Sequence, residues 1–151
     1  MKVVIQKVLN ANVVINDKVF NAIESGFLLL VGIEEGDTQE DLEKAAQKIA
    51  NLRIFPDEEG KLNLNIHQAK GEILSISQFT LAADCRKGNR PSFTQAMVPE
   101  QAKKMFHTFN EKLAQYNLTV KEGVFQEHMN VNINNDGPTT IILNIRDGKV
   151  I

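Results

Sequence analysis

The chain has 151 residues, of which 42% are hydrophobic and 24% charged, and its 17 basic and 19 acidic side chains give a net charge of −2. This composition excludes disordered, collagen-like and disulfide-scaffold classes and indicates a single globular domain over residues 1–151. The longest apolar stretch, residues 27–33, is far shorter than the ~20 residues of a membrane helix. Cys85 is the only cysteine, so no internal disulfide forms and a reducing cytoplasm is the expected compartment.

The first part of the chain predicts strands. β-Branched residues dominate residues 2–9 and 12–16, and Asn16-Asp17-Lys18 predicts a hairpin turn into Val19-Phe20. Residues 26–33 form a continuous apolar run between turn signals, which predicts a strand covered on both faces.

A first helix is predicted next. Asp37 or Thr38 can cap it, and four apolar residues follow at helical spacing on one face, namely Leu42, Ala45, Ala46 and Ile49. Pro56 and the polar turn 57–61 end this unit, and residues 63–66 are too short to assign. Residues 72–81 are the next strand candidate, apolar at first and polar at the end.

A second helix is predicted to start at Pro99, which suits a first helical position, and to stop near Asn117. Further strands are predicted over residues 119–125, 129–134 and 139–145. The sequence therefore predicts an α+β fold of curled, mostly antiparallel or mixed β-sheets, barrel-like, with two helices packed on one side.

Familiar catalytic machinery is absent from the sequence. His67, His107 and His128 are scattered, without the spacing of metal ligands, and we expect them to be exposed or structural. Neither a phosphate-binding glycine loop nor a Gly-x-Ser-x-Gly elbow occurs. Cys85 lies beside Arg86 and Lys87, but no base accompanies it.

Two polar segments suggest a site. Ser77-Gln78-Phe79-Thr80 places two hydroxyls and an amide where a sheet often opens to a ligand; an ordinary strand end is the alternative. Residues 134–139 predict a turn between two strands, in which Pro138 can adopt cis geometry.

A third segment concentrates positive charge. Arg86, Lys87 and Arg90 are three cations within five residues, in a chain whose overall charge gives no reason to expect a polyanionic partner. The loop is either a local contact for nucleic-acid phosphates or a solvated basic loop.

Taken together, these segments resemble the D-aminoacyl-tRNA deacylase family in its bacterial and eukaryotic form. The resemblance runs along the whole chain and rests on five segments in order: Met1 to Val8, Leu52-Arg53-Ile54-Phe55, Ser77-Gln78-Phe79-Thr80-Leu81, Arg86-Lys87-Gly88-Asn89-Arg90-Pro91-Ser92-Phe93, and Asn135-Asp136-Gly137-Pro138-Thr139.

The resemblance implies an enzyme that cleaves the ester between a D-amino acid and the terminal ribose of tRNA, with no metal or organic cofactor. It implies a homodimer in which Ser77, Gln78, Phe79 and Thr80 of one subunit form the pocket. Gly137 and Pro138 of the other subunit reach into that pocket with a cis peptide bond. Arg86, Lys87 and Arg90 are then candidates for tRNA phosphate contacts.

Such an arrangement selects chirality by sterics. If the amino group and the ester are both fixed, a D-residue sends its side chain to solvent and an L-residue drives it into the Gly137-Pro138 backbone; a thousandfold rejection needs roughly 4 kcal/mol. Glycine has no side chain to exclude, so we expect glycyl-tRNA, including that mischarged on tRNA(Ala), to be a substrate as well.

The sequence leaves two assignments open for the catalytic group and two for the nucleotide pocket. Thr80 is a candidate nucleophile without an evident base, and the substrate's own ribose hydroxyl, with an oxyanion held by N–H groups near Phe79 and Thr80, is the simpler hypothesis. Phe125 and Met129 either line a pocket for the terminal adenine or pack in the core. Rival functions are a non-catalytic RNA-binding dimeric domain and a different small hydrolase that uses Thr80 or Ser77.

Overall fold

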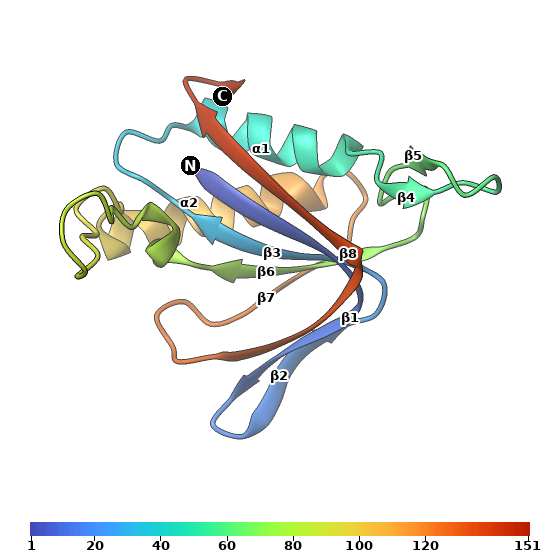
Figure 1. The fold of residues 1–151 in the computed structure, drawn as a ribbon, viewed down its shortest axis with the longest axis horizontal. Coiled ribbons are helices and arrows are strands. Elements are labelled where there is room, and N and C mark those ends of the chain that lie inside the picture. Colours follow the sequence, from blue (N-terminus) through green and yellow to red (C-terminus); the bar gives the residue numbers. More distant parts are fainter.

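The computed structural model describes residues 1–151, which form a curled main sheet with two helices on one face and a small second sheet (Figure 1). The elements, in chain order, are β1 (Lys2–Ile15), β2 (Lys18–Ile23), β3 (Gly26–Gly32), α1 (Gln39–Asn51), β4 (Phe55–Pro56), β5 (Leu62–Leu64), β6 (Glu72–Ser77), the 3-10 helix η1 (Phe79–Ala82), α2 (Pro99–Ala114), β7 (Val120–Glu122), β8 (Asn130–Arg146) and β9 (Lys149–Val150).

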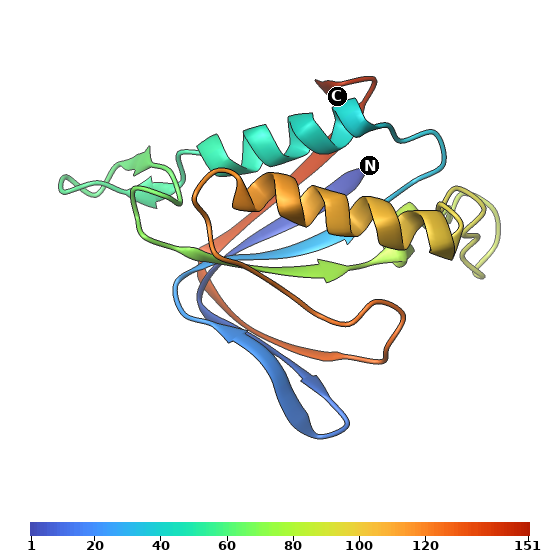
Figure 2. The same cartoon turned by 180° about the vertical axis from the view of Figure 1, so that it is seen from behind.

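The main sheet is mixed. Its strand order is β7-β6-β3-β1-β8-β9, with β2 paired to β1, while β4 and β5 form a separate small sheet. Strands β3, β6 and β7 run parallel to one another, whereas β1 is antiparallel to β2, β3 and β8. Both helices cover the same face of the sheet, as the reverse view shows (Figure 2). The predicted α+β class, with a curled mixed sheet and two helices on one side, is therefore confirmed.

Helix α1 begins as its sequence predicts. Thr38 is the N-cap: its hydroxyl accepts from the Asp41 N–H, and the Asp41 side chain accepts from the Thr38 N–H, which completes a capping box. The four apolar residues predicted to share a face are all fully buried. Asp37, the other candidate cap, lies outside the helix.

The core lies between the helices and the sheet. A cluster of 24 buried hydrophobic residues joins α1 and α2 to the inner faces of β1, β3 and β6. A second cluster of seven buried hydrophobic residues lies on the other face of the sheet, between β1, β2, β3 and β6. Strand β3 is covered on both faces, as predicted, because its side chains alternate between these two clusters. Neither α1 nor α2 combines the length and hydrophobicity that crossing a lipid bilayer requires.

Two predicted breaks are absent from the long strands. Residues 2–9 and 12–16 lie in one continuous strand, β1, up to Ile15. On one edge its partner changes from β3 at residues 2–8 to β2 at residues 11–15, while β8 pairs along the other edge. Residues 134–139, predicted as a turn between two strands, lie within the continuous strand β8. The prediction was wrong because a bulge takes up the extra residues: Gln6 pairs with Thr140 and Val8 with Asn135, so Lys7 alone faces residues 136–139.

Two other strands are shorter than predicted. The strand predicted over residues 72–81 ends at Ser77, and Phe79–Ala82 turns into η1 because Leu81 and Ala83 donate to the carbonyls of Gln78 and Thr80. Strand β7 covers only Val120–Glu122 of the predicted 119–125. The hairpin at Asn16-Asp17 is confirmed, since both residues have the positive φ that a tight two-residue turn requires.

Candidate active site

A cavity of about 670 Å³ opens beyond the carboxyl ends of β3 and β6. The start of α2 and the loop between β7 and β8 complete its walls. In sheets with parallel strands, ligands bind in such a crevice at the carboxyl ends. Eleven of the 17 residues that line the cavity are hydrophobic, which is typical of a site that buries an organic ligand and fixes it with a few polar groups.

The predicted segment Ser77-Gln78-Phe79-Thr80 lies at this cavity. Ser77, Gln78 and Phe79 line it, and Thr80 follows in η1, where its hydroxyl accepts a hydrogen bond from the side-chain amide of Gln78. A 3-10 helix that begins at Phe79 has no internal acceptor for the N–H groups of Phe79 and Thr80. These two donors, beside an apolar cavity, form a candidate site for a developing oxyanion.

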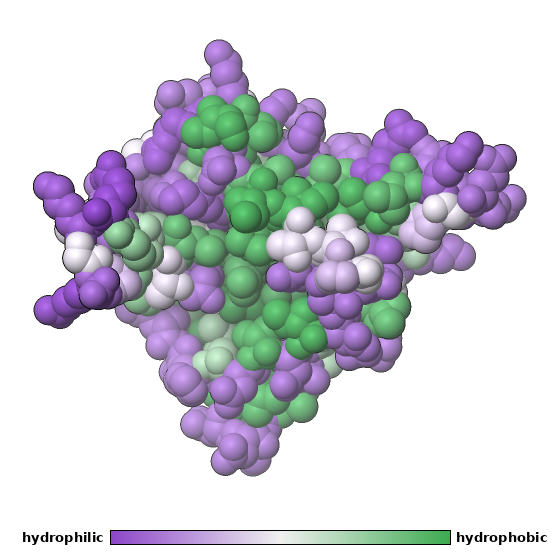
Figure 3. Space-filling view, in the orientation of Figure 1, coloured by the Kyte–Doolittle hydropathy of each residue, from purple (hydrophilic) through white to green (hydrophobic).

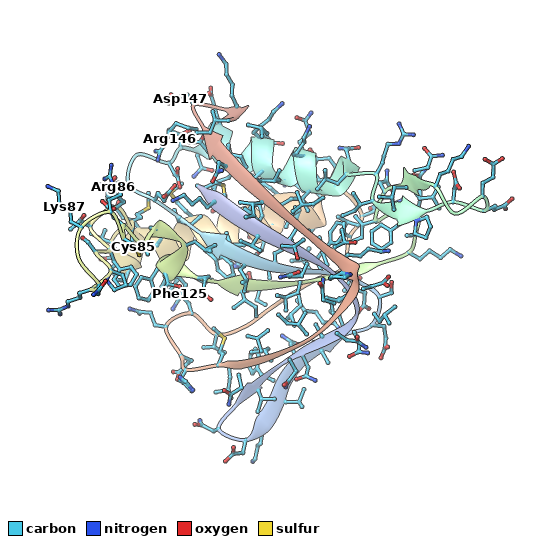
Figure 4. All side chains as sticks on the ribbon, in the orientation of Figure 1. Cys85, Arg86, Lys87, Phe125, Arg146 and Asp147 are labelled. Carbon is cyan, nitrogen blue, oxygen red and sulfur yellow. The ribbon has the colours of Figure 1, made fainter.

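Phe125 and Met129 also line the cavity, from the loop between β7 and β8. The Phe125 ring packs against Phe106 of α2, with 6.3 Å between ring centroids. Phe125 therefore belongs to the core and to the cavity wall at once, so the two sequence-based alternatives do not exclude each other. Figure 4 shows Phe125 at the same end of the molecule as the basic loop.

The basic loop, residues 85–91, is closed at its base by backbone hydrogen bonds. Asp84 and Ser92 exchange two backbone hydrogen bonds, of 2.8 and 3.0 Å, at the two ends of the loop. The Asp84 carboxylate accepts from the backbone N–H of Arg86 at 3.0 Å and from its Nε and Nη2 at 2.9 and 2.6 Å. The guanidinium and the backbone N–H of Arg86 hold the pKa of the Asp84 carboxyl well below its usual range. Lys87 and Arg90 form no ion pair and are exposed.

The structure holds the segment Gly137-Pro138 away from the core, in the β8 bulge. Both residues are exposed and the peptide bond between them is cis, as the resemblance implies. The Asn135 side-chain amide donates to the carbonyls of Lys7 at 2.9 Å and Thr139 at 3.0 Å. The Lys7 ammonium lies 3.0 Å from the Asp136 carboxylate. Lys7 and Asn135 thus fix the bulge from both sides.

Within one chain, this segment does not meet the cavity. The ladder joins Ser77 to Val31, Val31 to Val3 and Val3 to Leu143, so three strand spacings separate β6 from β8. Leu143 follows Gly137 by six residues. At the usual strand spacing and rise, Gly137 and Ser77 are roughly 20 Å apart along the sheet.

Sequence reasoning assigned no role to several residues that shape these features. Lys7 and Asn135 hold the bulge, and five other residues line the cavity, namely Phe93, Met97, Val98, Pro99 and Ala102. Phe93, Lys7 and Asn135 stand in segments that supported the resemblance, which was the available signal for them. No local pattern marked Lys7, because its partner Asp136 is 129 residues away.

The three histidines do not gather at the cavity. His67, His107 and His128 are exposed, on separate elements, as expected from their spacing. Only His128 borders the cavity. His107 faces Glu111 and Glu122 on the outer side of α2, at 3.4 and 3.7 Å.

Comparison with known proteins gives one consistent family. The family model described as D-Tyr-tRNA(Tyr) deacylase matches residues 4–144. A D-aminoacyl-tRNA deacylase of Staphylococcus epidermidis is 54% identical over 151 residues, which is the whole of both chains, and one of Staphylococcus aureus is 55% identical over 150 residues, or 99% of each.

Two solved structures are similar. One titled "c-Myc DNA Unwinding Element Binding Protein" is 42% identical, with a TM-score of 0.90 over 95% of this chain and 98% of that one. A probable eukaryotic D-amino acid tRNA deacylase shares the fold, with a TM-score of 0.80 at 16% identity over 93% of this chain and 97% of that one. With a family model that covers nearly the whole sequence and relatives more than half identical, this chain is a member of the D-Tyr-tRNA(Tyr) deacylase family.

Proposed function

We propose that this protein hydrolyses the ester bond of D-aminoacyl-tRNA and releases the D-amino acid and free tRNA, with residues 1–151 acting as one deacylase domain in the cytoplasm. The observation that carries the proposal is the identity of 54% over the entire chain with relatives named D-aminoacyl-tRNA deacylase. The cavity at Ser77, Gln78 and Phe79 supplies a site of fitting chemistry.

The reaction adds water to the ester carbonyl and breaks the bond between that carbon and the ribose oxygen, which leaves with a proton. The free N–H groups of Phe79 and Thr80 would stabilise the oxyanion, and each ~1.4 kcal/mol of stabilisation accelerates the step tenfold. The neighbouring ribose hydroxyl of the substrate would assist the attack or the departure of the leaving oxygen.

Thr80 as a nucleophile is less well supported by the geometry. Its hydroxyl accepts a hydrogen bond from the Gln78 amide, which cannot take up a proton. Single-turnover kinetics of Thr80→Ala distinguish the two mechanisms. Near-normal turnover is expected with an assisting substrate hydroxyl. An inactive variant, together with an acyl-enzyme trapped on the unaltered protein, would establish the nucleophile instead.

We propose that the chiral filter is Gly137-Pro138 of a second subunit. The segment is exposed and lies roughly 20 Å along the sheet from the cavity of its own chain, so another copy must bring it there. The face of the sheet opposite the helices supports such a contact. Register places Leu30, Val4 and Ile142 in one apolar row on this face, beside the buried Ile76; Leu30 and Val4 are half-buried and Ile142 is 63% exposed. Figure 3 shows hydrophobic residues gathered on this side of the molecule.

A mixed-subunit experiment tests the filter in trans. Phe79→Ala and Gly137→Ala chains carry different affinity tags, are co-expressed, and the mixed dimer is purified through both tags. One of its two sites then combines an intact Phe79 segment with an intact Gly137 from the partner, so about half of the native activity is expected. A mixed dimer as inactive as the two parents, or a monomer in sedimentation, would contradict the proposal.

The other proposed contacts concern the tRNA end. Phe125 and Met129 line the wall where the terminal adenine would stack or make apolar contacts. Arg86 and Lys87 lie at the same end of the molecule, on the loop that also carries Arg90. Because Asp84 already neutralises Arg86, Lys87 and Arg90 are the cations left for phosphates.

One assay tests the function as a whole. The protein is incubated with D-tyrosyl-, L-tyrosyl- and glycyl-tRNA, including glycine mischarged on tRNA(Ala), and ester loss is followed over time. Loss of the D-amino acid and glycine, with the L-ester intact, is expected. Loss of the L-ester as well would indicate a general esterase, and loss of none would indicate a non-catalytic nucleic-acid-binding dimer.

A further inference from the structure

We propose that Phe93 is a positioning residue for catalysis: its ring holds the Phe79 turn in the orientation that the reaction requires. This inference rests on the proposed function. The evidence is a contact between two aromatic rings at the mouth of the cavity. The Phe79 and Phe93 centroids lie 5.2 Å apart at an interplanar angle of 68°, an edge-to-face contact.

The Phe79 ring is not enclosed by the hydrophobic core. The residue is 58% exposed, and it begins η1, in which the N–H groups of Phe79 and Thr80 have no internal acceptor. Phe93 is the only aromatic ring that contacts it. An aromatic side chain exposed to this extent is not fixed by core packing, so the edge-to-face contact decides where the ring rests.

Phe93 itself is firmly held. On one side, Ser92 exchanges two backbone hydrogen bonds with Asp84. On the other, the Phe93 carbonyl accepts from Ala96 N–H at 3.0 Å, and the Gln95 carbonyl accepts from Glu35 N–H at 2.9 Å. The ring therefore projects from a backbone that is anchored before and after it.

These contacts connect the two ends of the basic loop back to the Phe79 turn. The chain leaves Phe79, passes through η1 to Asp84, crosses to Ser92 through two hydrogen bonds, and returns from Phe93 to Phe79 through the aromatic contact. The basic loop lies between Asp84 and Ser92, and Phe93 directly follows it. A phosphate bound at Lys87 or Arg90 would thus contact the loop whose end carries the Phe93 ring.

The role assigned to Phe93 is distinct from substrate binding. If the ring orients Phe79, its loss weakens interactions made in the transition state, so kcat falls and KM for tRNA does not change. If the ring itself bound the nucleotide, KM would rise instead.

Steady-state kinetics on D-tyrosyl-tRNA test this with three variants. Phe93→Leu, which keeps apolar volume but removes the ring edge, should lower kcat about tenfold and leave KM within about twofold. Phe93→Tyr retains the ring edge and should restore kcat to within about twofold of the native value. The matched control, Phe20→Leu, removes a similarly exposed ring from the distant β2 hairpin and should leave both constants unchanged. Thermal unfolding of each variant confirms that the fold is retained, and Phe93→Met replaces Phe93→Leu if Tm falls.

A double-mutant cycle completes the test. Because Phe93 acts through Phe79, the Phe79→Leu/Phe93→Leu variant should be no slower than Phe79→Leu alone. Additive losses, a native kcat in Phe93→Leu, or a change confined to KM would each overturn the inference. These outcomes leave the proposed function intact as long as the unaltered protein removes D-tyrosine from tRNA; an unaltered protein without activity would contradict the proposed function itself.

Discussion

The ammonium of Lys7 lies 3.0 Å from the carboxylate of Asp136, the residue that precedes Gly137-Pro138. The Lys7 side chain is only 11% exposed, and its ammonium also lies 5.4 Å from the centre of the Phe55 ring. This ion pair joins the middle of β1 to the bulge of β8, on which the proposed chiral filter depends.

Removal of the Lys7 charge should loosen the bulge. Lys7→Met retains an apolar stem but leaves Asp136 without its partner, so we expect kcat/KM for D-tyrosyl-tRNA to fall about tenfold, a loss of ~1.4 kcal/mol in transition-state stabilisation. Hydrolysis of L-tyrosyl-tRNA should become detectable in the same assay, because the filter is less well fixed. Lys7→Arg, which keeps the charge, should retain both rate and selectivity.

The exposed pair Lys61–Glu59 provides the control for this variant. Both side chains are about three-quarters exposed, and pairs of this kind contribute little to stability. Lys61→Met should therefore match the native enzyme, and an equal effect of the two lysine variants would contradict a specific role for Lys7.

Gly137→Ala should inactivate the enzyme without unfolding it. Gly137 has φ +120, a conformation that L side chains rarely adopt, and a Cβ there would lie 2.6 Å from Thr139 Oγ1 and 3.0 Å from the Thr139 nitrogen. The bulge must shift, at a cost of ~1–3 kcal/mol. We expect kcat/KM to fall at least a hundredfold while circular dichroism stays native, since the segment is exposed; a native rate would rule out this residue as the filter.

The basic loop should determine the salt dependence of tRNA binding. Lys87→Glu with Arg90→Glu should weaken binding and reduce the slope of log K against log salt by about one for each phosphate that the loop no longer binds. Titration of deacylated tRNA at several NaCl concentrations measures this slope. Lys48→Glu, on the exposed side of α1, changes charge elsewhere and should leave the slope unchanged; the same slope in all three proteins would exclude the loop as the binding surface.

Acid should remove the contribution of Asp41 to stability. Burial favours the neutral carboxyl, but hydrogen bonds from the N–H of Gly148 and from the N–H and hydroxyl of Thr38 outweigh it, and the pKa of Asp41 is lowered from 3.8. Between the folded-state pKa and 3.8 the unfolded chain binds more protons, so this contribution is complete above 3.8 and is lost as the pH falls through the folded-state pKa.

Asp41→Asn therefore gives a pH-dependent difference. In urea unfolding at pH 7 the variant should be ~1–2 kcal/mol less stable than the native protein, because the hydrogen bonds from Thr38 and Gly148 no longer end on a charged carboxylate. The difference should shrink below pH 3.8. A constant difference from pH 7 to pH 2 would contradict this account.

Local patterns predicted the parts of the fold that depend on local physics. Apolar spacing found the buried face of α1, Thr38 was one of its two predicted caps, Pro99 marked the start of α2, and Asn16-Asp17 marked a turn. Where a strand ends or bends depends on its neighbours. The break inside β1 was wrong because β8 pairs along nearly all of it, and Phe79 lies in η1 because the chain leaves the sheet after Ser77.

The candidate site likewise has one part that local sequence predicted and another that depends on contacts between distant residues. The segment at Ser77 to Phe79 was recognisable from its polar residues after an apolar strand, and the structure places it at the cavity. The contacts of Lys7 with Asp136 and of Phe93 with Phe79 join residues far apart in the sequence or on opposite sides of a loop, and no periodicity reports such pairs.

Strand β8 also limits how sequences of this family can change in length. Its 17 residues carry the exposed Gly137-Pro138 segment near the middle and the buried Leu143 and Ile145 towards the end. Since side chains alternate along a strand, inserting or deleting one residue after the bulge, between Thr140 and Leu143, would turn Leu143 and Ile145 out of the core. Insertions and deletions between homologues are therefore expected in the hairpin tip at 57–61 and the basic loop, while the part of β8 that follows the bulge changes by substitution alone.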